Sequence, residues 1–230
     1  MADIDWRYMP WTIYDLETTG AEPETARVVQ VALVRMEGGQ VVKAAKTLCN
    51  PGLRIPEEAS AVHGITDAMV ADAPSDSDVI ANLAAGLADA SVIVSYNGFR
   101  FDDAIVARIA GIDLDVLWSN AVRVDTLLLV RHDKIGRFWK GTGRHKLAAV
   151  AEKLGIHADG AMHDAGTDAA VTGRILWHLV TSEPYASVVS DILPSDHTVT
   201  ATLRRFAAAQ EVERQKYLMK LAKMGADKET

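Results

Sequence analysis

Two acidic residues one position apart, Asp15 and Glu17, are the first candidates for chemistry in this chain. They follow a short apolar run, 11–14, that we interpret as a β-strand. Alternate side chains of a strand point to one face, so the two carboxylates would lie together. Adjacent carboxylates resist ionisation unless a cation lies between them, and Mg²⁺ prefers oxygen ligands of this kind. The pair therefore indicates either a divalent-metal site or two solvated acids at the end of a strand.

Two further groups of polar residues occur later in the chain. Residues 97–103 follow a buried strand predicted at 91–95 and begin a helix predicted at 101–110, a position where α/β folds place ligands. His163 and Asp168 would lie about 140° apart on one helix, so they could not share a helical face. We therefore expect His163 on the loop before a helix at 164–180, Asp164 as the N-cap, and Asp168 within the first two turns.

Composition limits the possible classes of protein. The 230 residues suit one large domain or a domain with an extension, and 49% of them are apolar. The single cysteine, Cys49, excludes an internal disulfide, and we expect it to pack as a small apolar residue. A net charge of −7 argues against coating duplex nucleic acid through charge alone, but it allows a local groove for one strand. No signal peptide and no membrane-spanning run are evident, so we expect a cytoplasmic protein without a membrane partner.

The order of the predicted elements indicates an α/β fold with a mixed sheet. A tight turn at 37–39 joins two strand-like runs into an antiparallel hairpin. Further strands and helices then alternate along the chain. The predicted elements are strands at 28–36, 40–48, 91–95 and 122–124, and helices at 57–62, 77–89, 101–110, 125–131, 146–154 and 164–180.

A basic segment, 134–146, interrupts the pattern and contains Phe138 and Trp139. Its lysines and arginines could follow phosphates while Trp139 stacks on a base. The alternative is a loop that packs on the core through Trp139, and we favour the contact with nucleic acid because the positive charge is concentrated here.

The residues from 183 to 230 lie outside the alternating pattern. A helix at about 198–224 would place its apolar residues near one face, namely Leu203, Phe206, Tyr217, Leu221 and Met224. We favour packing of this helix on the core over binding of a protein partner or self-association through residues 185–230.

In order and spacing, the motifs resemble those of the DEDDh family of 3′–5′ exonucleases, which includes polymerase proofreading subunits, ribonuclease T, oligoribonuclease and exonuclease I. The matching motifs are Asp15-x-Glu17-Thr18-Thr19-Gly20, His63-Gly64-Ile65-Thr66, Asn97-x-x-Arg100-Phe101-Asp102 and His163-x-x-x-x-Asp168. The later motifs are most similar to those of the catalytic domain of exonuclease I. The resemblance implies an RNase H-like fold with a mixed five-stranded sheet flanked by helices, an exonuclease domain at 9–182 and a helical C-terminal extension at 183–230.

The resemblance also implies roles for individual residues. Two Mg²⁺ ions, replaceable by Mn²⁺, would be held by Asp15, Glu17, Asp102 and Asp168, with His163 as the general base. Thr18, Thr19, His63 and Ile65 would hold the 3′-terminal nucleotide, and Asn97 and Arg100 would be further substrate contacts. We interpret Asp103 as a solvated acid at the start of a helix.

Two functions follow from this resemblance. One is metal-dependent 3′–5′ hydrolysis of single-stranded DNA or short RNA, which releases nucleoside 5′-monophosphates. The alternative is a non-catalytic or proofreading accessory subunit that binds 3′ ends and a polymerase.

Overall fold

The computed structural model describes residues 5–226, apart from the side chains of residues 217 and 220–226. A five-stranded sheet forms its centre, with strand order β3-β2-β1-β4-β5. β1 pairs with β2, and β2 with β3, in antiparallel fashion, whereas β1 with β4 and β4 with β5 are parallel. The strands are β1 (Trp11–Thr18), β2 (Val28–Glu37), β3 (Gln40–Leu48), β4 (Val92–Ser95) and β5 (Val122–Asp125). The predicted mixed sheet is confirmed.

The β2–β3 hairpin forms where the sequence predicted it. Gly38 and Gly39 both have positive φ angles, 55° and 79°, which a tight hairpin turn requires and glycine adopts without strain. β1 extends beyond the predicted run and includes Asp15 and Glu17, which lie opposite Ala32 and Gln30 of β2. β3 is the outermost strand, and its side chains are exposed.

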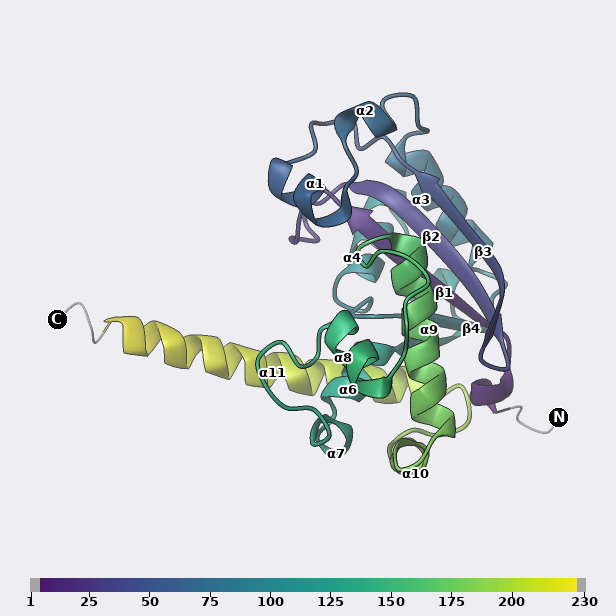
Figure 1. Cartoon of the computed structure of the whole chain (residues 1–230), viewed down its shortest axis with the longest axis vertical. Coiled ribbons are helices and arrows are strands. Elements are labelled where there is room, and N and C mark those ends of the chain that lie inside the picture. Colours follow the sequence, from purple (N-terminus) through teal and green to yellow (C-terminus); the bar gives the residue numbers. More distant parts are fainter. Residues whose placement is uncertain (1–4, 227–230) are drawn as a thin grey trace.

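Each face of the sheet carries its own core, because alternate residues of β1 point in opposite directions. Ile13 packs with helix α9 (Ala165–Thr181), whereas Tyr14 and Leu16 pack with α3 (Asp76–Gly86) and α4 (Asp102–Ala110). Figure 1 shows α9 crossing the sheet. A Cβ atom at Gly173 would clash with the side chain of Met36 and press on Ile13, so glycine lets α9 lie this close to the sheet.

Several short helices surround these layers. α1 (Glu57–His63) and α2 (Asp67–Val70) form a small third cluster around Ile65. Cys49 is buried in the core beside α3, as predicted, and burial raises its pKa to about 12. The remaining short elements are η1 (Trp6–Tyr8), α5 (Leu114–Leu117), α6 (Thr126–Arg131), α7 (Asp133–Gly136) and α8 (Leu147–Leu154).

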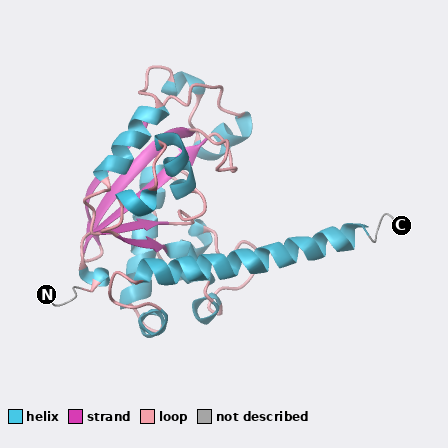
Figure 2. Cartoon of the chain, turned by 180° about the vertical axis from the view of Figure 1, so that it is seen from behind, coloured by secondary structure: helices cyan, strands magenta, loops and turns pink. Residues whose placement is uncertain are grey.

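The C-terminal region begins with α10 (Tyr185–Ile192) and continues into the long helix α11 (Val199–Ala226). Val189, Val199 and Leu203 are buried in the same core as α9. The start of α11 therefore packs on the body as favoured, while its later part projects away (Figure 2). The predicted apolar positions Tyr217, Leu221 and Met224 lie outside the described side chains, and the boundary at 182–183 stays a prediction. Within the described residues, no helix has the length and apolar character of a transmembrane segment.

Candidate active site

Three carboxylates converge from two elements that are far apart in the sequence. Asp15 and Glu17 leave β1 on the face covered by α9, and Asp168 comes from the first turn of α9. One oxygen from each of the three carboxylates lies within 4.8 Å of the others. Glu17 and Asp168 are only 9% and 7% exposed, so little water can compensate for their charges. This arrangement agrees with the interpretation of Asp15 and Glu17 as metal ligands and does not fit two solvated acids.

Asp102 is the fourth acidic residue of this group. It begins α4, directly after the loop that follows β4, and it is buried. After burial itself, the charge of Asp102 is the largest cause that raises the pKa of Asp15, so these two carboxylates interact electrostatically, although Asp102 is not one of the three whose oxygens converge. The topology thus brings all four predicted acids together at one end of the sheet.

The electrostatics of the group favour a bound cation. Burial and then the neighbouring carboxylates raise the pKa of Glu17 to about 7, and burial raises that of Asp168 to about 6. Burial also raises the pKa values of Asp15 and Asp102 well above their usual range. Oδ1 of Asp168 is buried and has no hydrogen-bond partner among the described residues. A divalent cation would satisfy this oxygen and offset the repulsion, so the residues fit a metal centre.

His163 lies on the loop immediately before α9, as the helical geometry predicted. Its φ angle of 63° is in the left-handed region, and its side chain is exposed. The backbone N–H of His163 donates to Oδ2 of Asp168 over 3.2 Å. Asp164 caps α9 by accepting from the N–H of Thr167 over 3.1 Å, as predicted. The backbone of His163 is therefore held beside Asp168, and its exposed imidazole is free to accept a proton from water.

Thr18 and Thr19 follow the two acids of β1 and close the next loop. The hydroxyl of Thr18 donates to the carbonyl of Gly20 over 2.8 Å. The Thr19 N–H donates to the carbonyl of Arg27, and the Arg27 N–H donates back to the Thr19 hydroxyl over 3.0 Å. Thr18 is half-buried beside the acids, whereas Thr19 holds the loop and is buried itself.

His63 and Ile65 lie at the end of α1. The N–H of Ile65 donates to Nδ1 of His63 over 3.0 Å, and the Ile65 side chain is buried in the third cluster. Nε2 of His63 is buried and has no hydrogen-bond partner among the described residues. Burial lowers the pKa of His63, and the charge of His163 lowers it further, so the two histidines face one region.

The loop that contains Asn97 and Arg100 is held by a residue that the sequence analysis did not single out, Asp125. Asn97 has a φ angle of 71°, and its N–H donates to Asp125 Oδ1 over 2.9 Å. Asp125 also accepts from the N–H groups of Phe99, over 3.2 Å, and Leu127, over 3.0 Å. Burial raises its pKa to about 6. An aspartate between a strand and a helix is a pattern typical of an N-cap, and this signal could have identified it.

The interpretation of Asp103 as a solvated acid is wrong. Asp103 is buried, and it forms an ion pair with Arg123 of β5 and accepts a hydrogen bond from the Tyr14 hydroxyl. The guanidinium of Arg123 in turn lies over the rings of Trp118 and Phe99, at 5.2 and 5.3 Å. A buried arginine and a buried tyrosine both need a polar partner, and the acid next to Asp102 supplies it.

The predicted base-stacking role of Trp139 is also wrong. Its indole is buried, donates to the carbonyl of Val130 over 3.0 Å, and stacks on Tyr185 at 5.9 Å. Phe138 packs edge-on against the same tyrosine at 4.9 Å. The aromatic part of the basic segment therefore anchors a loop on the core, which was the alternative interpretation.

Comparison with known proteins supports the resemblance to exonucleases that the motifs indicated. The family model described as exonuclease, RNase T, matches residues 12–176. Over 223 residues the chain is 28% identical to a DNA polymerase III PolC-type protein of Thermotoga maritima, and the match covers 94% of this chain but 15% of that protein. It is 29% identical over 167 residues to the DNA polymerase III subunit epsilon of Aquifex aeolicus, covering 72% of this chain and 77% of the other.

The fold is shared with E. coli exonuclease I, solved in complex with a dT13 oligonucleotide. That structure gives a TM-score of 0.67 at 22% identity, over 80% of this chain and 43% of the other. The RNase H-like fold expected from the motifs is thereby confirmed. Together with the family match over most of the sequence, the motifs show that the chain belongs to the DEDDh family of 3′–5′ exonucleases.

Proposed function

We propose that this chain hydrolyses the 3′-terminal phosphodiester bond of single-stranded nucleic acid and releases nucleoside 5′-monophosphates. The observation that carries this proposal is the convergence of the Asp15, Glu17 and Asp168 oxygens within 4.8 Å, beside Asp102. Two Mg²⁺ or Mn²⁺ ions, when bound, would stabilise the attacking and leaving oxygens at phosphorus. Asp15, Glu17 and Asp168, together with Asp102, would hold these ions.

The remaining residues would position the substrate and move a proton. His163, at the solvent edge of the carboxylates, would take a proton from the attacking water. Thr18, Thr19, His63 and Ile65 would surround the last nucleotide of the strand. His63 offers its Nε2 atom there, whereas the buried Ile65 and the internally bonded Thr19 would shape the pocket through the backbone they hold.

A 5′-labelled single strand tests this function. In Mg²⁺ the wild-type protein should give a ladder that shortens from the 3′ end, and EDTA should abolish it. Asp15→Asn should reduce the rate by at least about 10³-fold, since one metal ligand would be lost. Asp89→Asn, which removes an exposed carboxylate from the turn after α3, is the matched control and should retain full activity. Hydrolysis by Asp15→Asn at the control rate would contradict the proposal.

Matched DNA and RNA strands, compared with a mismatched duplex at equal salt, would define the substrate. Distinguishing DNA from RNA requires contacts to the 2′-hydroxyl, so the ratio of the two rates reports those contacts directly.

We also propose a polymerase as a protein partner, because two of the matched relatives are named as DNA polymerase III proteins. The acidic set is complete, which favours a catalytic subunit over a non-catalytic adaptor. Residues 185–203 contribute to the core, so deleting the whole extension would disturb folding. Deleting 217–230 instead, followed by size-exclusion chromatography, tests self-association. An unchanged elution volume would contradict self-association through this part of α11.

A further inference from the structure

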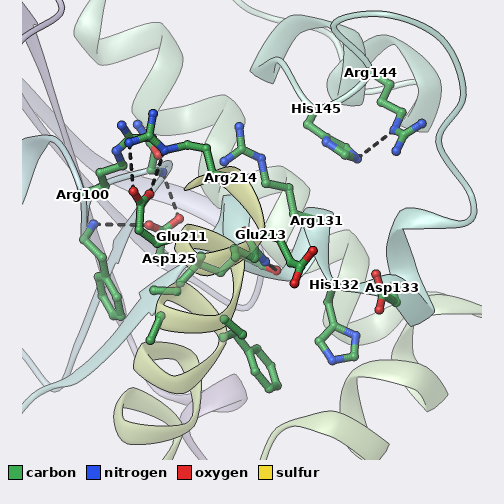
Figure 3. A pocket seen from close by; sticks show the side chains of 18 residues that line it. Arg100, Asp125, Arg131, His132, Asp133, Arg144, His145, Glu211, Glu213 and Arg214 are labelled. Carbon is green, nitrogen blue, oxygen red and sulfur yellow. Dashed lines mark hydrogen bonds and ion pairs between the residues drawn. The ribbon is translucent and has the colours of Figure 1, made fainter. Parts of the chain in front are cut away.

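A cavity of about 1200 Å³ lies between the loop after β4 and helix α11 (Figure 3). Pockets for small molecules have volumes of about 300–1,000 Å³, so this cavity suits an extended chain better than one small ligand. Asn97, Phe99 and Arg100, from the loop that precedes Asp102, line one part of this cavity. Asp102 lies two positions after Arg100, at the start of α4, so this loop joins the cavity wall to a residue of the proposed catalytic centre.

The carboxylates that line the cavity already have partners, or they lie away from its centre. Asp125 accepts three backbone N–H groups. Glu211 pairs with Arg214 at 2.8 Å, and Glu213 pairs with Lys216 at 2.7 Å. Asp133 lies beside His132 at one end of the cavity (Figure 3).

Two arginines that line the cavity have no carboxylate partner among the described residues. Arg131, at the end of α6, and Arg144 are both exposed, and neither forms an ion pair with a carboxylate of the described residues. Nε of Arg144 bonds to Nε2 of His145 over 3.2 Å, and the Tyr96 hydroxyl fixes the His145 carbonyl at 2.6 Å. Burial and the charges of both arginines lower the pKa of His145, so the two guanidinium groups lie close to one imidazole. Such a group of cations attracts a polyanion.

The wall formed by α11 is different in character. Phe206, Ala207 and Ala208 present an apolar strip, and Phe206 packs on His132 with 4.7 Å between ring centroids. Single strands are commonly held by cations that contact the phosphates and by apolar or aromatic surface that contacts the bases. The cavity offers both kinds of surface.

We propose that Arg131 and Arg144 bind the phosphodiester backbone of a single strand upstream of its 3′-terminal nucleotide, while the strand's bases lie against the α11 strip. This inference rests on the proposed function, and it places the second wall of the binding groove on a helix that lies beyond the matched family region, 12–176.

Fluorescence anisotropy in EDTA tests the groove without hydrolysis. The probes are fluorescein-labelled oligo-dT and oligo-U strands of about twelve and about three nucleotides, lengths within or below the site sizes of single-strand binders. The double variant Arg131→Gln/Arg144→Gln should raise the Kd for the longer strands by about tenfold or more. It should also reduce the slope of log K against log salt by about 1.4, since each phosphate contact contributes about 0.7. A similar rise in the Kd for DNA and RNA would identify the shared phosphate as the ligand. A rise in the Kd for only one of the two would contradict a contact with the phosphodiester backbone.

Lys43→Gln is the matched control, because it removes one exposed positive charge from the outer strand β3. Arg131→Lys/Arg144→Lys, which keeps both charges, should retain most of the affinity. The proposal is overturned if the double glutamine variant binds the longer strands as tightly as Lys43→Gln does, or if it weakens the shortest strands equally. Tight binding without any hydrolysis in Mg²⁺ would refute the proposed function but leave the groove intact. A normal ladder with unaltered affinity in the double variant would refute only the groove.

Discussion

The hydroxyl of Tyr14 donates a hydrogen bond to Oδ1 of Asp103, and each of these residues is next in sequence to a carboxylate of the site. Tyr14 precedes Asp15 on β1, and Asp103 follows Asp102 at the start of α4. Arg123 of β5 pairs with the other oxygen of Asp103. Three elements are thus joined on the face of the sheet opposite α9, and we expect this buried contact to hold Asp15 and Asp102 in position.

Removing the carboxylate of Asp103 should therefore affect both stability and activity. Asp103→Ala leaves the buried guanidinium of Arg123 without one of its two acidic partners, and we expect a loss of about 3 kcal/mol in the free energy of unfolding. The kcat should fall about tenfold, because Asp102 loses its support. Tyr14→Phe removes only one hydrogen bond and should cost about 1 kcal/mol. Urea denaturation and steady-state kinetics give the two quantities.

Asp159→Ala is a suitable control for that experiment. Asp159 also pairs with an arginine, Arg174, but its side chain is 79% exposed. Exposed pairs contribute about 0–1 kcal/mol, so this variant should unfold at nearly the wild-type urea concentration. If Asp103→Ala and Asp159→Ala lowered the free energy of unfolding equally, the buried ion pair would contribute no more to stability than the exposed one.

Stability without metal should decrease as the pH rises. The pKa of Glu17 is raised to about 7 and that of Asp168 to about 6, whereas such carboxyl groups ionise near about pH 4 in an unfolded chain. Between these values the folded protein binds more protons than the unfolded chain, so its stability falls as the pH rises through about 6 to 7. In EDTA, the melting temperature should be lower at about pH 8 than at about pH 5.5.

Mg²⁺ should reverse this trend, because metal binds the ionised carboxylates. We expect saturating Mg²⁺ to raise the melting temperature by at least several degrees at about pH 8, and by much less at about pH 5.5. In Asp15→Asn, the response to Mg²⁺ should be lost. A shift of equal size at both pH values would contradict coupling between the acids and the metal.

His163→Ala should separate proton transfer from metal binding. The rate should fall by about 10²–10⁴-fold, the usual contribution of a general base. The rise in melting temperature with Mn²⁺ should persist, because only the backbone N–H of His163 contacts Asp168. His197→Ala, at an exposed histidine before α11, serves as the control and should leave the rate unaltered. Loss of the Mn²⁺ response in His163→Ala would argue for a structural role instead.

Trp139→Ala tests the corrected placement of this residue. Removing a buried indole should lower the free energy of unfolding by about 3–5 kcal/mol. Trp139→Phe keeps much of the packing but loses the hydrogen bond to Val130, so it should be destabilised less and should keep the wild-type KM for an oligonucleotide. A raised KM with unaltered stability in Trp139→Phe would restore the base-stacking interpretation.

The mixed sheet and the pairing of Asp15 with Glu17 followed from local patterns, whereas Asp102 and Asp168 were assigned as metal ligands from the resemblance to the exonuclease family. Alternation placed Asp15 and Glu17 on one face of β1, and the helical angle separated His163 from Asp168 correctly. Both features depend only on the period of an element, which the sequence displays directly.

The roles of Asp103 and Trp139 could not be predicted in this way, because each depends on a distant partner. Asp103 is buried by Arg123 and Tyr14, and Trp139 by Tyr185. An acid at the first turn of a helix, or an aromatic residue in a basic loop, has the same local pattern whether it is exposed or buried. The groove beside α11 likewise combines residues from four separate segments, and no local spacing predicts it.

The position of β1 has a consequence for the newly made protein. This first strand lies at the centre of the sheet, and its two acids need Asp168 from the last helix that crosses that sheet. During synthesis on the ribosome, the N-terminal carboxylates emerge long before α9 does. If the proposed site is the catalytic one, the nascent chain should therefore remain unable to hydrolyse nucleic acid until about 180 residues have emerged and α9 has docked.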